Sequence, residues 1–188
     1  MKKLIALLLV MVMAMGLIAC GNNANTTTTT EGVQGPASAL ELLETVWAAH
    51  AEDEKFFTMG GDMNNMVDNA PGKYDLADEG LTSTLLIPEA EIANVDEAAS
   101  LVHGMMLNNF TCGAFHVTGD VKAFADAMNT AITNNRWMCG MPEKMLVAIV
   151  GEYVVATFGL ESVITTFEGK LTAAYPSTEI AYSAAITG

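Results

Sequence analysis

Basic residues are scarce in this sequence. Its 188 residues include eight Lys and Arg against 22 Asp and Glu, which gives a formal net charge of −14. Proteins bind nucleic acids largely by neutralising phosphates with Lys and Arg, and they approach anionic lipid with the same side chains. The composition therefore argues against a nucleic-acid-binding protein and against electrostatic docking of the domain on a membrane.

The sequence also lacks the motifs that mark common enzyme classes. It contains no GxSxG, HExxH, CxxC or Walker loop, and Gly60-Gly61 is too short to cradle a phosphate. The acidic pairs at 53–54 and 96–97 are adjacent residues and not carboxylates facing each other across a cleft. We therefore predict no catalytic residue and no cofactor.

The first 19 residues have the pattern of an export signal. Lys2 and Lys3 precede an uncharged, mostly apolar run over 4–18, which is the order of a secretory signal and is too short for a permanent membrane span. The run ends in Leu17-Ile18-Ala19-Cys20, which resembles the lipobox of bacterial lipoproteins. That resemblance implies cleavage after Ala19 and lipid on Cys20, so the chain would be anchored on the extracytoplasmic face of the cell membrane.

The segments after the lipobox set the expected domain limits. Residues 20–35 include a run of five Thr and have almost nothing to bury, so we predict a disordered tether. Residues 36–175 suffice for one domain, and 176–188 are predicted to be a flexible tail. Loss of Lys2 and Lys3 with the signal would leave six basic and 22 acidic residues, a formal charge of −16.

Hydrophobic periodicity predicts an α+β domain. Ser38 and Glu41 form a capping box that should begin a helix ending near Ala51. Beyond a short helix within 77–87, the pattern predicts two strand-strand-helix units, over 98–107, 110–117 and 121–136, and over 145–150, 153–158 and 160–171. We expect these ββα units to form a four-stranded antiparallel sheet with helices on one face. A helix from Val95 to Met106 is the alternative to the first strand, which we prefer because it completes the repeat.

Two cysteines, Cys112 and Cys139, fall within the predicted domain. A strand from 110 to 117 and a helix returning over it both span about 25 Å, so Cys139 would come back to the level of Cys112. A disulfide between them is the candidate pairing for an exported protein, and two buried thiols are the alternative.

Methionine and histidine suggest two sites that must be weighed against ordinary packing. Met59, Met63 and Met66 form one group and His103, Met105 and Met106 another. Copper is bound by such side chains, but Met also fills irregular cores. The oxygen ligands of Asp62, Asn64, Asn65 and Asp68 suit calcium, yet the run lacks the EF-hand pattern. We predict no metal site. His50, His103 and His116 could serve acid–base chemistry, and paired strands would make the last two near neighbours.

Three segments carry a resemblance to a known family. These are Thr58-Met59-Gly60-Gly61-Asp62, Met141-Pro142-Glu143 and Val150-Gly151-Glu152-Tyr153-Val154. With the lipobox and tether, their order over 41–171 resembles a family of small lipoproteins of Gram-positive bacteria described as a domain of unknown function. The resemblance implies an extracytoplasmic lipoprotein and carries over no catalytic residue.

The sequence as a whole favours a non-catalytic binding or interaction module held at the membrane by its lipid. Its partner would be a protein or a small molecule bound against the sheet or the Met-rich loop. The alternatives are an envelope-associated enzyme of hydrolase type and a metal-capturing lipoprotein.

Overall fold

The computed structural model describes residues 35–138 and 140–187. The predicted signal peptide, the lipidation residue Cys20, nearly all of the predicted tether, and Cys139 lie outside the described residues. Within the described ranges, no helix combines the length and the apolar character needed to cross a membrane. The strands and packed helices all belong to one compact unit, residues 33–188.

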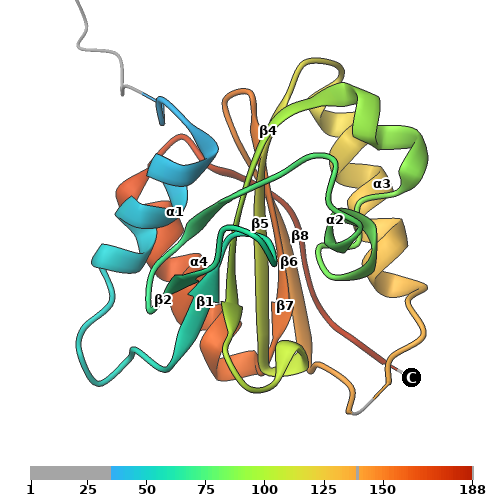
Figure 1. The fold of residues 1–188 in the computed structure, drawn as a ribbon. Coiled ribbons are helices and arrows are strands. Elements are labelled where there is room, and N and C mark those ends of the chain that lie inside the picture. Colours follow the sequence, from blue (N-terminus) through green and yellow to red (C-terminus); the bar gives the residue numbers. More distant parts are fainter. Residues whose placement is uncertain (1–34, 139, 188) are drawn as a thin grey trace, which may run out of the picture. The chain divides into compact units, whose positions relative to one another are not determined.

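An eight-stranded antiparallel sheet forms the centre of the domain (Figure 1). The strand order is β2-β1-β4-β5-β7-β6-β8, and β3 pairs with β4 beside β1. The strands are β1 (Thr58–Gly60), β2 (Val67–Asp68), β3 (Gly72–Tyr74), β4 (Val95–His103), β5 (Phe110–Val117), β6 (Lys144–Val150), β7 (Tyr153–Gly159) and β8 (Glu179–Ala185).

Helices cover both faces of this sheet. Helices α1 (Ala39–Ala48) and α4 (Glu161–Ala174) pack on one face, and α3 (Val121–Thr133) packs on the other together with the short α2 (Gly80–Ser83) (Figure 1). The 3-10 turns η1 (Glu89–Asn94) and η2 (Leu107–Asn109) precede β4 and β5. Because side chains alternate along a strand, Phe110 and Cys112 of β5 enter the α1–α4 core, whereas Phe115 enters the α3 core.

The predicted four-stranded sheet with helices on one face is therefore wrong. Four further strands extend the sheet, and α3 lies on the face opposite α4. The physical reason is visible in β6 and β7, where Met145–Val150 and Tyr153–Gly159 are buried at every position. Strands buried on both faces have continuous apolar runs, while strands with one wet face alternate.

The structure tests three further predictions, which concern the first helix, the segment around 95–107 and the C-terminal segment. Ser38 caps α1 by accepting a 3.0 Å hydrogen bond from the Glu41 amide, and the helix ends three residues earlier than expected. For the segment in which a helix was the alternative, the preference for a strand is confirmed. The strand β4 spans Val95–His103, whereas the prediction was 98–107. The flexible tail predicted from 176 is wrong, because Glu179–Ala185 pairs with β6 as the edge strand β8.

Strands β1 and β3 share one edge of β4, and glycine makes this possible. Thr58 and Met59 pair with the C-terminal end of β4, while 72–74 pair with residues 98–100. A Cβ on Gly60 would lie 2.2 Å from the Gly72 amide nitrogen, a backbone atom that cannot turn aside. Ser100 fastens the junction, because its Oγ accepts from the Gly61 amide at 3.0 Å and donates to the Gly61 carbonyl at 3.2 Å.

Substitution of Gly60 tests this close approach. Gly60→Ala should lower the free energy of unfolding by about 3 kcal/mol because two backbone segments must separate. Gly169→Ala is the matched control: it lies inside α4 with no atom within 4 Å of the added Cβ, so it should stabilise by about 0.5–1 kcal/mol. Urea unfolding measures both, and equal effects of the two substitutions would contradict the close approach.

Candidate functional site

Methionine dominates the exposed apolar surface of the described residues. Nine large hydrophobic side chains are exposed, and six of them are methionines: Met63, Met66, Met105, Met106, Met138 and Met141. Met63 and Met105 are 77% and 81% exposed, whereas Met128 and Met145 are buried in the core. Core filling therefore explains only a minority of the methionines, and contiguous exposed apolar surface marks interaction sites.

Four methionines line one cavity of about 560 Å³, which we call the methionine pocket. Met59 lies on β1, Met63 and Met66 lie on the turn between β1 and β2, and Met105 follows β4. The pairing of Met59 with Val102 brings these two chain regions together. The two methionine groups that are separate in sequence thus meet at one site, although Met106 does not line it.

The carboxylate of Asp62 organises the turn that carries Met63 and Met66. Asp62 is 3% exposed. Its Oδ1 accepts hydrogen bonds from the amides of Asn64 (2.8 Å) and Asn65 (3.1 Å). Its Oδ2 accepts from the Asp75 amide at 3.0 Å, just beyond β3. Both oxygens also accept from the Asn65 side-chain amide at 3.2 Å.

These hydrogen bonds keep Asp62 ionised despite its burial. Burial by itself would raise the pKa of the Asp62 carboxyl. The Asn65 side chain and three backbone N–H groups outweigh that effect and hold the pKa below its usual value. Protein N–H groups thus take the place of water around this buried charge. They also join the turn to the C-terminal end of β3.

Another part of the pocket wall comes from α2 and the segment before it. The Tyr74 hydroxyl would lie 2.0 Å from a Cβ on Gly80, so a larger residue at position 80 would displace it. Asp78 accepts a 2.7 Å hydrogen bond from the Gly80 amide. Burial and the nearby charge of Asp78 raise the pKa of Tyr74 to about 12, so its hydroxyl stays protonated.

The connection after β4 closes the pocket, and His103 shapes it. The His103 ring stacks on Phe56 with centroids 5.3 Å apart. Its Nδ1 accepts hydrogen bonds from the amides of Met105 (3.1 Å) and Met106 (3.2 Å). In the neutral ring this acceptor role assigns the proton to Nε2. His103 therefore holds the loop that presents Met105.

The charges around the methionine pocket have one sign. Asp62, Asp78 and Glu79 line it, and no Lys or Arg is among its lining residues. The site thus combines thioether groups with carboxylates in a chain that is strongly acidic overall. It offers an apolar surface with a negative rim.

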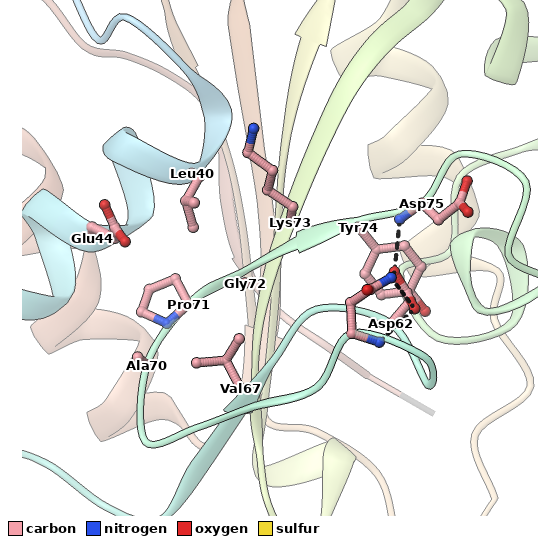
Figure 2. Close-up of a pocket in the computed structure, with 11 residues that line it drawn as sticks. Leu40, Glu44, Asp62, Val67, Ala70, Pro71, Gly72, Lys73, Tyr74 and Asp75 are labelled. Carbon is pink, nitrogen blue, oxygen red and sulfur yellow. Dashed lines mark hydrogen bonds between the residues drawn. The ribbon is translucent and has the colours of Figure 1, made fainter.

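A second cavity of about 580 Å³ lies behind the same turn, between α1 and β3 (Figure 2). Leu40 and Glu44 of α1 face Pro71 across it, and Lys73 projects from β3. Asp62 lines both cavities and is seen bonded to the Asp75 amide in Figure 2. This cavity holds both charge signs and no exposed methionine, so the methionine pocket is the stronger candidate.

The structure shows how the candidate calcium and copper ligands are arranged. No group of three His, Cys, Asp or Glu side chains among the described residues is placed to hold a metal ion. The oxygens of Asp62 already accept N–H groups, so the candidate calcium ligands do not converge through it. The candidate copper ligands Met59, Met63, Met66, His103 and Met105 line one cavity, and the Nδ1 of His103 already accepts two backbone N–H groups.

The histidines do not form an acid–base pair. His103 and His116 lie at opposite ends of the sheet, because His116 pairs with Glu97, about 20 Å along β4 from position 103. Their predicted proximity is wrong. His116 bonds to Asp96 through Nδ1 at 2.5 Å, and its Nε2 faces Glu152 at 3.8 Å, so these contacts raise its pKa. His50 is a core residue whose pKa burial lowers.

Cys112 is a core residue as well. It is fully buried on the face covered by α1 and α4, whereas α3 packs on the other face. Burial raises the pKa of the Cys112 thiol, so it is not a thiolate nucleophile. Cys139 lies outside the described residues, and the Cys112–Cys139 disulfide stays a prediction.

Comparison of the chain with protein-family models, with curated proteins and with solved structures gives no match.

Replacement of Asp62 tests its role in organising the site. Asp62→Ala should lower the free energy of unfolding at about pH 7 by roughly 1–3 kcal/mol, because three backbone N–H groups and the Asn65 side chain lose their charged acceptor. The folded pKa of Asp62 is lowered, so its contribution is complete above about pH 4 and is lost as the pH falls further. The difference between the two proteins should therefore shrink at about pH 2.5. A difference that does not change with pH would contradict this role, and exposed Asp53→Ala serves as the control.

Proposed function

We propose that this protein is a lipid-anchored extracytoplasmic lipoprotein whose domain is a non-catalytic binding module, with the methionine pocket as its ligand site. The export pattern and lipobox support the anchoring, and the segment 20–35 would hold the domain away from the membrane surface.

The observation that carries the proposal is the exposure of six methionines, three of them around one cavity. An exposed thioether side chain is unbranched and polarisable, so it adapts its shape to apolar partners of different form. Surfaces that bind varied partners use flexible Met for this reason. The frame beneath is rigid, because β1, β3 and β4 are held together by Ser100 and Asp62.

The chemistry of the pocket favours binding over catalysis. A hydrolase would need a nucleophile beside a base. The His116 ring is held by carboxylates, and the Cys112 thiol is buried and protonated. At the methionine pocket, His103 is engaged with backbone amides. The ligand class that fits best is an apolar or amphipathic molecule.

Binding of the neutral dye N-phenyl-1-naphthylamine tests the proposal, with the soluble chain from Gly21 to Gly188. The dye should bind and brighten, and Met63→Gln with Met105→Gln should weaken its affinity about 10-fold, because polar amides replace apolar contact. Both side chains are already exposed, so the fold should not change.

Met138→Gln with Met141→Gln is the matched control, because these exposed methionines do not line the pocket. Their replacement should change the affinity for the dye less than about 2-fold. A dye that fails to bind, or equal losses in the two double variants, would contradict the pocket as the ligand site.

A further inference from the structure

We infer that the ligand of the methionine pocket is a cationic amphipathic helix, a peptide segment with an apolar face and a Lys- or Arg-rich face. This inference rests on the proposed function and names the class of partner. It follows from three features of the described residues: the shape of the apolar surface, the sign of the charge around it, and the adaptability of its side chains.

The apolar surface is longer than the cavity. Leu107 of η2 lines the pocket and is 43% exposed. The neighbouring Asn108 donates through its side chain to the carbonyls of Met138 (2.8 Å) and Gly140 (2.6 Å). These bonds hold the backbone that carries the exposed Met138 beside η2, so exposed apolar residues are present beyond the pocket on the Leu107 side. A small molecule needs a concave pocket alone, whereas a helix lays a row of apolar side chains along such a surface.

The charge around this surface selects the sign of the partner. Asp78 is half-buried and Glu79 is exposed at the rim, beside Asp62. No Lys or Arg among the described residues lines the pocket, and the single arginine of the chain, Arg136, lies outside it. A negative rim attracts Lys and Arg side chains and disfavours acidic partners, since like charges brought together cost free energy. An acidic helix of equal apolarity would therefore bind poorly.

The methionine side chains of the pocket are compatible with amphipathic helices of different sequences. Apolar residues on an amphipathic helix recur every three or four positions. The thioethers of Met63, Met66 and Met105 can adjust to Leu, Ile or Phe at those positions. Specificity then comes from charge and from helical spacing more than from a particular side chain.

Three synthetic peptides of equal length test the inference. The first is an amphipathic helix of Leu and Lys, the second has Glu in place of every Lys, and the third has the Leu and Lys composition in an order that destroys the apolar face. With the soluble chain 21–188 and fluorescence anisotropy, the Leu–Lys helix should bind at least about 10-fold tighter than either other peptide at low salt. Its affinity should fall as salt is added.

Two double variants that remove the same number of charges distinguish the effect of the rim charges on binding from the effect of the protein's net charge. Asp78→Asn with Glu79→Gln removes two rim charges, and the Asn oxygen can still accept the hydrogen bond from the Gly80 amide. Asp53→Asn with Glu89→Gln removes two exposed charges away from the pocket. The rim pair should weaken Leu–Lys binding about 5-fold, and the distant pair less than about 2-fold.

Each outcome decides a separate point. Equal binding of the Lys and Glu helices, or equal effects of the two charge variants, would overturn the inference. If the dye still binds and still responds to the change at Met63 and Met105, the proposed function survives that result. Loss of both dye and peptide binding would overturn the proposed function together with the inference.

Discussion

Hydrogen bonds to the carboxylate of Asp62 hold together the segments that form the site. This carboxylate is a buried charge in a strongly acidic chain, held by backbone amides and by Asn65 in place of water. Through these bonds the turn after β1 is tied to the end of β3, although β1 and β3 each pair separately with β4. The glycines at positions 60 and 72 let the two backbones meet there. Both cavities lie against this turn, so their walls share one support.

Hydrophobic patterns located the strands β4 to β7 and the helices α1, α3 and α4, because these elements carry apolar runs or stripes. They did not reveal how the layers stack. The continuous runs of β6 and β7 are the pattern of strands covered on both faces, and they could have predicted helices on opposite sides of the sheet. Strand β8 was not predicted because Glu179–Ala185 contains only one β-branched residue, Ile180. Its pairing with β6 stabilises the strand. The meeting of β1 with β3 depends on tertiary contacts that no local pattern records.

The sequence showed two separate groups of methionines, and only the folded structure brings members of both to one cavity. The two groups around Met59 and Met105 are far apart in the chain, and the pairing of β1 with β4 joins them. Exposure could not be read from the residue type, since Met145 is buried and Met105 is not. The apparent calcium ligand Asp62 has a structural role, which depends on amides that converge from separate segments. Net charge, in contrast, is a property of composition and already indicated a partner that is not acidic.

We propose that the thioethers around one cavity form the ligand site. Carbon-13 labelling of the methionine methyl groups, read by NMR during titration of the soluble chain with the Leu–Lys helix, tests it most directly. Binding at this site should shift the methyl signals of Met59, Met63, Met66 and Met105, while those of the buried Met128 and Met145 stay unchanged. Shifts confined to methionines outside the pocket, or a bound peptide that moves none of these four signals, would contradict it.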